Sequence, residues 1–353
     1  MTMKTLSLCP TCYKKIPAEI AFRAGQAFMD KICDVHGPFT AVVEKSIQHV
    51  SNFYQYGTLG NNNVIIVHAH NGCNMSCPWC YYPMGEEKMM PFSYYDNLLF
   101  QYKGTHRLLF SGGEPTLRVD YFKFVQEAVE AGWDPASITN MLKLAEPEFF
   151  ARTVGSSMFV QNGIYLYALS MQHPKNYSKE IFDRKMTALE NIDRAGLKAM
   201  CVMFSISSLD ELEWIRHFYN ETKHLYVMIR IRTLFRNWKN KDGDQAARER
   251  IFLSDLHKEF LARFGDLQPV QSRMVELSNM YCLYMRMDNG MNVSLSAGPT
   301  VEELDYHLCT RPVLMLAMDG KCYPVPIAQI VNEGISLGWK DGFRVEGGSL
   351  CGS

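Results

Sequence analysis

Six apolar runs, each of strand length, recur along residues 64–234 with helix-like segments between them. They are rich in the Val, Ile, Tyr and Phe residues that strands favour: Val64–His70, Arg107–Ser111, Ser137–Asn140, Ile164–Met171, Lys198–Ile206 and Leu225–Leu234. Most are continuous rather than alternating, which is typical of parallel strands covered on both faces. We therefore expect an α/β fold built on a partial (β/α)6 TIM-like barrel with right-handed crossovers.

The chain divides into three predicted parts. Residues 1–55 are expected to form a small N-terminal metal-binding module of zinc or rubredoxin type, and residues 56–265 the barrel. Residues 266–353 are expected to form a β-rich extension that covers the substrate side. Asp288–Gly290 and Asp319–Gly320 each separate apolar segments in that last part, as hairpin turns do.

Polar residues mark where several helices of the middle region should begin. Short side-chain acceptors before an apolar run satisfy the free N–H groups of a helix start. The expected helix starts are Ser93 with Asp96, Asp120 before Tyr121–Ala131, and Ser208 with Glu211. One more helix is predicted over Asp244–Phe264.

The charge balance and the cysteine content limit the classes of function. Lys and Arg number 36 against 37 Asp and Glu, so the formal net charge of −1 gives no molecule-wide field for polyanions. The N-terminus lacks the apolar run of a signal peptide, and no stretch approaches a membrane span. We therefore predict a cytoplasmic protein, in which the 11 cysteines serve as metal ligands rather than disulfides.

Three of these cysteines stand close together directly after the first predicted strand. Cys73, Cys77 and Cys80 have the spacing C-x3-C-x2-C, which lets one loop supply several ligands to an iron–sulfur cluster. Three ligands would leave one iron open, as a catalytic metal site requires. The alternatives are a buried helical face, which Pro78 argues against, and a structural zinc with a distant fourth ligand.

This triplet resembles the signature of the radical S-adenosylmethionine (radical SAM) superfamily, including an aromatic residue, Trp79, before the last cysteine. Ser111–Pro115, which reads S-G-G-E-P after the second strand, resembles the GGEP motif of that superfamily. Ile138–Asn140 resembles its third-strand segment, although the usual following glycine is Met141 here. The resemblance covers about residues 60–235, with the motifs in order on successive strands.

The resemblance implies a [4Fe–4S] cluster on the three cysteines, bound S-adenosylmethionine, and a reducing donor of flavodoxin or ferredoxin type. A reduced cluster would split the sulfonium, and the resulting deoxyadenosyl radical would abstract a hydrogen atom from a substrate. The residues expected to contact the cosubstrate are Trp79 at the adenine, Gly112 and Gly113 at the methionine moiety, Glu114 at its ammonium, Ser170 and Gln172 at the ribose, and Arg230, rather than Arg232, at the carboxylate. Pro115 and Asn140 are expected to bind the cosubstrate as parts of their two motifs.

A second metal site is predicted near the N-terminus. Cys9 and Cys12 form one knuckle, and Cys33 and His36 form another. Paired knuckles with a Cys3His ligand set suit tetrahedral zinc, with a mononuclear iron as the alternative. The pattern resembles the N-terminal module of certain radical SAM methylases and carbon–carbon coupling enzymes. Because a four-ligand site is closed, we expect a structural role.

The remaining cysteines are widely spaced. An auxiliary cluster would require several of them to converge, with Cys282, Cys309 and Cys322 as candidates. Buried free thiols are the simpler interpretation of these residues and of Cys201 and Cys351.

A basic segment with interleaved aromatic residues follows the last predicted strand. Residues Arg230–Lys241 contain five positive charges and no acid, together with Phe235 and Trp238. Such a segment suits a phosphate-bearing substrate, a nucleotide or nucleic acid, and the alternative is a solvated linker.

Three functions remain open. The first is a radical SAM enzyme that rearranges, couples or oxidises its substrate after hydrogen abstraction. The second is a radical SAM methylase, which the N-terminal module favours. The third is a non-catalytic iron–sulfur and zinc protein, which Gly112–Glu114 argues against because a passive cluster needs no cosubstrate site.

Overall fold

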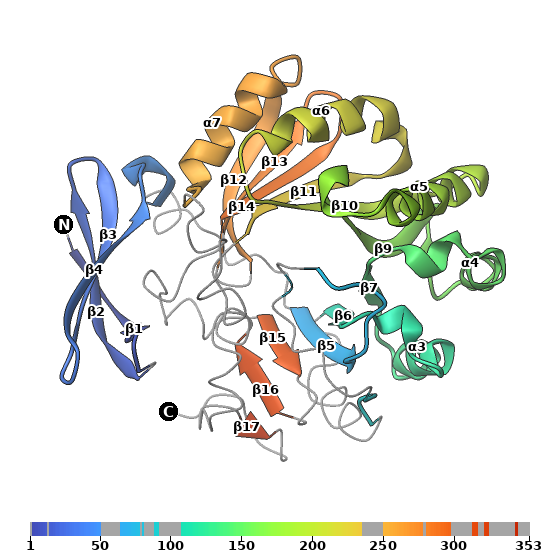
Figure 1. Ribbon diagram of the computed structural model, residues 1–353, viewed down its shortest axis with the longest axis horizontal. Helices are drawn as coiled ribbons and strands as arrows, with labels where there is room; N and C mark the ends of the chain where they lie inside the picture. The colour runs from blue at the N-terminus through green and yellow to red at the C-terminus, as the bar shows by residue number, and fades with distance from the viewer. Residues whose placement is uncertain are drawn as a thin grey trace.

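The structure, a computed structural model, contains two β-sheets, and helices cover the larger one (Figure 1). It describes residues 2–12, 14–50, 64–77, 80, 88–91, 107–234, 250–277, 280–297, 313–316, 321–324 and 343–344. No helix in these ranges is long and apolar enough to cross a membrane.

The N-terminal sheet is an antiparallel meander in which each strand pairs with the next. Its strands are β1 (Thr2–Leu8), β2 (Lys15–Arg23), β3 (Gln26–Cys33) and β4 (Gly37–Glu44). Ala24 and Gly25 both have positive φ and join β2 to β3 in a two-residue hairpin, a geometry that matches the twist of the strands. The buried face carries a small core that includes Ile20, Met29 and Val43.

The large sheet is parallel through its centre, and its central strands follow the order of the chain. These strands are β5 (Val64–His70), β6 (Arg107–Gly112), β7 (Pro135–Thr139), β9 (Ile164–Met171), β10 (Lys198–Ile206) and β11 (Met228–Thr233). The short β8 (Val160–Gln161) pairs with β9 alone. This succession confirms the predicted partial (β/α)6 architecture.

Strands from the last third of the chain extend this sheet at both edges. Beyond β11 lie β14 (Asn292–Ala297), β13 (Met280–Met287) and β12 (Pro269–Leu277). Beyond β5 lie β15 (Val313–Leu316), β16 (Lys321–Pro324) and β17 (Phe343–Arg344). The pairs β13–β14 and β15–β16 are antiparallel, as the two predicted hairpin turns require.

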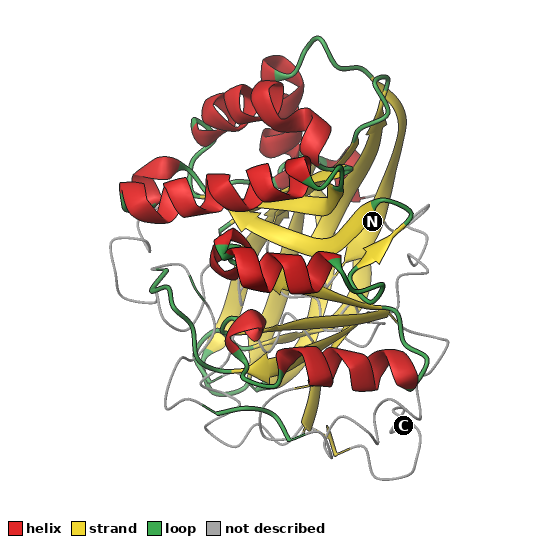
Figure 2. Cartoon of the chain, turned by 90° about the vertical axis from the view of Figure 1, so that its right-hand side faces the viewer, coloured by secondary structure: helices red, strands yellow, loops and turns green. Residues whose placement is uncertain are grey.

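Five α-helices cover one face of the large sheet in its described part (Figure 2). They are α3 (Tyr121–Glu130), α4 (Pro147–Val154), α5 (Lys179–Arg194), α6 (Glu211–Thr222) and α7 (Leu253–Arg263). Short 3-10 turns accompany them at η1 (Pro115–Leu117), η2 (Leu142–Ala145), η3 (Pro174–Asn176) and η4 (Lys223–Leu225). The main core lies between these helices and the sheet.

The helix starts differ in detail from the predictions. Asp120 precedes α3 as expected, but its carboxylate accepts hydrogen bonds from Arg118 instead of from the helix. Asp210 rather than Ser208 precedes α6, and the Glu211 carboxylate accepts hydrogen bonds from the backbone N–H and the hydroxyl of Ser207.

The helix predicted over Asp244–Phe264 is α7, and it begins only at Leu253. Residues 250–252 precede it without helical structure, whereas residues 244–249 lie outside the described part. Ser93 and Asp96, predicted to start another helix, also lie outside it.

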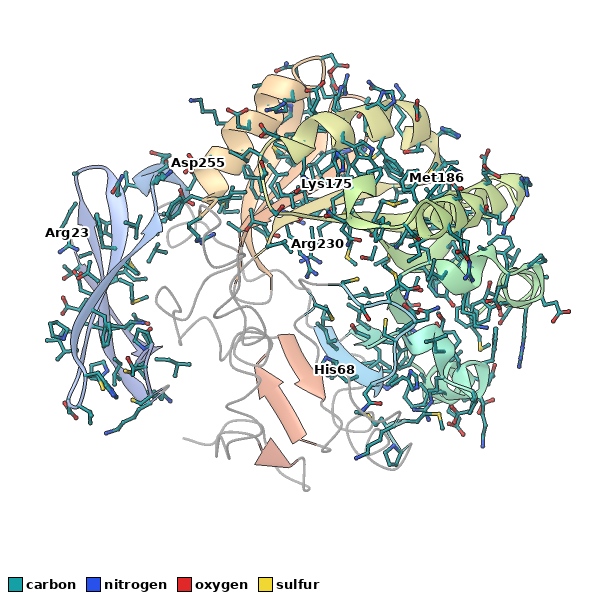
Figure 3. All side chains as sticks on the ribbon, viewed as in Figure 1. Arg23, His68, Lys175, Met186, Arg230 and Asp255 are labelled. Atoms are coloured by element: carbon teal, nitrogen blue, oxygen red, sulfur yellow. The ribbon has the colours of Figure 1, made fainter. Side chains whose placement is uncertain are left out.

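One buried carboxylate fastens the N-terminal sheet to the barrel. Glu44, at the end of β4, accepts hydrogen bonds from the backbone N–H of Leu253, at 3.0 Å, and from the hydroxyl of Ser254. The carboxylate therefore satisfies free donors at the N-terminus of α7, where negative charge is favourable. Lys45 adds an ion pair of 2.9 Å to Asp255, which is labelled in Figure 3.

Candidate functional site

The cysteine loop leaves the carboxyl end of β5. Residues 71–77 are not helical, so the three cysteines do not form one face of a helix, which was the first alternative considered. The backbone N–H of Cys80 donates to the carbonyl of Cys77 at 3.0 Å, so the chain turns back between these two residues. Burial raises the pKa of the Cys73 thiol, and the negative charges of Glu114 and Cys80 raise it further.

The glycine pair after β6 holds this loop by direct backbone contact. Gly113 donates to the carbonyl of His70 at 2.7 Å, and Glu114 donates to that of Gly72 at 2.8 Å. A Cβ atom on Gly112, whose φ is +120°, would lie 2.3 Å from the His70 oxygen. A Cβ atom on Gly113 would lie 2.2 Å from the Gly72 oxygen. Only glycine fits at either position, so the motif seats the cysteine loop; its expected approach to a methionine moiety stays a prediction.

The Glu114 side chain joins the ends of two strands. It is 1% exposed, and its Oε1 accepts from the hydroxyls of Thr116, at 2.6 Å, and Thr139, at 2.8 Å. Its Oε2 accepts from the backbone N–H of Asn140 at 2.6 Å. Burial raises the pKa of Glu114 although these donors favour the ionised form. Pro115 opens η1 directly behind it.

Asn140 links the end of β7 to the cysteine loop. Its Nδ2 donates to the side-chain oxygen of Asn74 at 2.7 Å and to the sulfur of Cys73 at 3.8 Å. The next residue, Met141, stands where glycine is usual and adopts φ +76°. It is fully buried, and its backbone N–H donates to the hydroxyl of Thr139 at 3.1 Å, so local contacts hold this left-handed conformation.

Two more predicted contact residues lie at the end of β9. Gln172 is buried, and its Nε2 donates to the hydroxyl of Ser170 at 2.9 Å. The two side chains thus occupy one spot beside β7, which pairs with β9. Trp79 lies outside the described residues.

Arg230 and Arg232 lie on the same face of β11, because alternate residues of a strand point the same way. Ile229 and Ile231 are buried on the opposite face, in the core beneath the helices. Figure 3 shows Arg230 extending from the sheet away from α6 and α7. Both arginines therefore lie on the face of the sheet opposite the helices, and the contact of Arg230 with the cosubstrate carboxylate stays a prediction. Arg232 donates from Nε to the hydroxyl of Ser205 at 2.9 Å.

Lys185 is a polar residue of this region that the sequence interpretation missed. It lies on α5, is fully buried, and donates from Nζ to the carbonyls of Asn140 and Ser170, each at 2.7 Å. The signal was present: Lys185 occupies the first position of the stripe that continues at Ala188, Leu189 and Ile192. A lysine in an otherwise apolar stripe indicates a buried partner.

The N-terminal cysteines and histidine gather as predicted. The ligating atoms of Cys9, Cys12, Cys33 and His36 all lie within 4.8 Å of one another. Cys9 and Cys33 sulfurs lie 3.5 and 3.6 Å from His36 Nδ1, and the Cys12 and Cys33 sulfurs are 4.0 Å apart. Tetrahedral zinc with ordinary bond lengths requires about 3.5 Å between S and N and about 3.8 Å between sulfurs. The site therefore has the size of a zinc centre.

The remaining cysteines do not test the auxiliary-cluster hypothesis. Cys201 and Cys282 are buried on β10 and β13. Cys309, Cys351 and the side chain of Cys322 lie outside the described part of the structure.

Comparison with known families identifies two regions of the chain. Residues 67–218 match the radical SAM superfamily, and residues 1–45 match the HMPTM N-terminal zinc ribbon domain. The chain therefore contains a radical SAM domain and an N-terminal zinc ribbon domain. This family implies a [4Fe–4S] cluster and S-adenosylmethionine as cofactors.

One curated relative is the 7,8-dihydro-6-hydroxymethylpterin dimethyltransferase of Methanocaldococcus jannaschii. It is 25% identical over 240 residues, which cover 58% of this chain and 47% of the relative. The chain thus spans about half the length of this relative.

Two solved structures of Streptococcus suis SuiB share the fold. The complex with the precursor peptide SuiA has a TM-score of 0.53 at 14% identity and covers 81% of this chain and 64% of that one. The complex with S-adenosylmethionine has a TM-score of 0.51, also at 14% identity, and covers 81% and 65%.

Proposed function

We propose that this radical SAM protein is an enzyme that holds its [4Fe–4S] cluster on Cys73, Cys77 and Cys80 and binds S-adenosylmethionine beside it. The observation that carries the proposal is the contact between the glycine turn at Gly112–Gly113 and the cysteine loop. Two motifs far apart in the sequence form one unit at the carboxyl edge of a parallel sheet, where α/β proteins bind ligands.

The donor set fits the group that the family implies. Three thiols from one loop suit an iron–sulfur cluster, and they leave a fourth position for the cosubstrate. When bound, the cluster and S-adenosylmethionine supply one-electron cleavage of the sulfonium and a deoxyadenosyl radical that abstracts a hydrogen atom.

The protein residues bind and orient the cosubstrate in this proposal. Glu114 Oε2 accepts a single described hydrogen bond, which leaves a lone pair for the cosubstrate ammonium. Ser170 and Gln172 offer hydrogen-bonding groups to the ribose at the end of β9. Arg230 provides a cation for the carboxylate, because its buried Nε has no hydrogen-bond partner within the described chain.

We also propose that the substrate carries a phosphate or another anionic group. The inner face of the sheet places Ser294 and Ser296 opposite Arg230 and Arg232. Both serines are buried, and the Ser296 hydroxyl has no hydrogen-bond partner among the described residues. Next to Arg230, which is assigned to the cosubstrate, the guanidinium of Arg232 among these hydroxyls forms a favourable environment for a substrate anion. Residues 235–241, the rest of the predicted basic segment, lie outside the described part.

Hydrogen abstraction that leads to rearrangement, coupling or oxidation of the substrate is one candidate reaction, and methyl transfer is the other. The zinc ribbon family and the dimethyltransferase name of the archaeal relative favour it over rearrangement, coupling or oxidation. The ribbon has no direct role in this chemistry, because four protein ligands complete its metal site.

Anaerobic reconstitution followed by an assay for 5′-deoxyadenosine tests the proposal. The wild-type protein should form it from S-adenosylmethionine and dithionite, whereas a Cys73→Ser/Cys77→Ser/Cys80→Ser variant should not. Equal product from both proteins would refute the cluster assignment, and none from a cluster-loaded wild type would favour a non-catalytic protein. A deuterated methyl group transferred to 7,8-dihydro-6-hydroxymethylpterin would identify a methylase.

A further inference from the structure

Lys185 is a buried cation next to the cysteine loop. Its hydrogen bonds explain why a donor lies there, but they do not explain why that donor is charged. Its ammonium spans the ends of β7 and β9 by donating to the Asn140 and Ser170 carbonyls. The ring of Tyr177 covers it at 4.9 Å. A neutral donor would join two carbonyls with a smaller desolvation cost, so the positive charge itself needs a partner.

That partner is not a carboxylate that forms an ion pair. Within the part of the chain that the structure describes, no Asp or Glu lies within ion-pair distance of Lys185. Burial lowers the pKa of Lys185 to about 8, and the negative charges of Cys77, Glu114 and Cys73 act against this effect. Two of these three groups are expected cluster ligands, and the Glu114 carboxylate is held by Thr116, Thr139 and Asn140, with its remaining lone pair assigned above to the cosubstrate ammonium.

We propose that Lys185 is a positioning residue that compensates the negative charge of the iron–sulfur centre and raises its reduction potential. The proposal rests on the cluster assignment made above. A cluster with three thiolate ligands becomes more negative when it accepts an electron from an external reductant, so a fixed nearby cation favours the reduced state. The low dielectric around a fully buried ammonium strengthens this effect.

The same lysine also fixes a direct contact to a ligand. By binding the Asn140 carbonyl, Lys185 holds the residue whose side chain donates to the Cys73 sulfur. Hydrogen bonds to cluster sulfurs raise the reduction potential as well. The positive charge of Lys185 and the hydrogen bond that it helps to hold therefore both raise the reduction potential.

A potentiometric titration of the reconstituted protein without S-adenosylmethionine, followed by EPR, tests the proposal. Lys185→Met should raise the ratio of oxidised to reduced cluster at a fixed potential at least tenfold, a shift of about 59 mV for one electron. Lys185→Arg should stay within about threefold of wild type because it keeps the charge. Lys179→Met, on the same helix with a side chain 88% exposed, should have no effect because solvent screens its charge.

An unchanged potential in a fully loaded Lys185→Met protein would overturn the proposal. If Lys185→Met and Lys185→Gln both lose iron while Lys185→Arg keeps it at the wild-type potential, the charge requirement is supported. Loss of iron from all three variants would overturn it, because a purely structural role would then suffice. A wild-type protein without a four-iron EPR signal would instead refute the proposed function.

Discussion

Replacing Gly113 with alanine should separate the cysteine loop from β6. The added Cβ would lie 2.2 Å from the Gly72 oxygen, 2.7 Å from the Gly72 carbonyl carbon and 2.9 Å from the Asn71 oxygen. All three are backbone atoms, so no side-chain rotation relieves the contact. An ordinary contact of 3.4 Å requires the loop to retreat by about 1.2 Å.

This movement would lengthen both hydrogen bonds that seat the loop. At 2.7 and 2.8 Å they would stretch beyond the normal range. Two lost hydrogen bonds and the overpacking together cost about 2 to 6 kcal/mol. Unlike Gly112, Gly113 has no positive φ, so the effect of Gly113→Ala is purely steric.

Iron and acid-labile sulfide content after reconstitution, together with the urea midpoint of the cluster-free protein, measure this effect. We expect Gly113→Ala to lose most of its iron and to unfold at lower urea. Gly265→Ala is the matched control, because its Cβ would have 3.4 Å to its nearest neighbour and no strained φ. If both variants load iron and unfold like wild type, the seating argument is wrong.

Three further predictions concern the zinc ribbon and its attachment. Cys33→Ser should remove the N-terminal metal and expose the ribbon to proteolysis, because such metal sites contribute about 10 kcal/mol or more to folding. Metal analysis and limited digestion would measure both effects, and a ribbon that resists digestion would contradict the prediction. Glu44→Gln should weaken the attachment of the N-terminal sheet to α7 by about 1 to 3 kcal/mol. Urea unfolding would measure this loss, and an unchanged unfolding midpoint would contradict the prediction. Burial lowers the pKa of His257 to about 4 in the folded protein. Because His257 of the unfolded chain binds a proton at higher pH than His257 of the folded protein, the free energy of unfolding should fall as pH drops from about 6.5 to 4. Urea denaturation at several pH values should therefore show a flatter pH dependence of stability for His257→Gln than for wild type. An equally steep pH dependence in the variant would assign the effect to its partner His49 instead.

The sequence predicted the strands well where burial is uniform. β5, β9 and β10 begin and end at the predicted residues, because polar or turn-forming residues bound their apolar runs. β11 begins at Met228 rather than Leu225, since residues 223–225 form a 3-10 turn that apolar content alone does not reveal.

Contacts between distant segments were beyond the reach of the sequence. Glu44 reads as an ordinary strand-end acid, yet it binds the start of a helix 209 residues away. The GGEP resemblance likewise predicted a cosubstrate contact, but gave no sign that Gly112 and Gly113 must themselves touch the cysteine loop. Local patterns specify which elements form, whereas such contacts depend on how the elements pack together.

The described site is a continuous series of hydrogen bonds across four strand ends. The glycine turn after β6 grips the loop that follows β5, Glu114 binds the Asn140 backbone at the end of β7, and Lys185 joins Asn140 to Ser170 at the end of β9. Asn140 then returns to the loop through the Cys73 sulfur. Because every step shares a residue with the next, the position of the cysteine loop depends on the spacing of all four strands. Substitutions within this series should therefore be non-additive, and their coupling should appear first in the properties of the cluster.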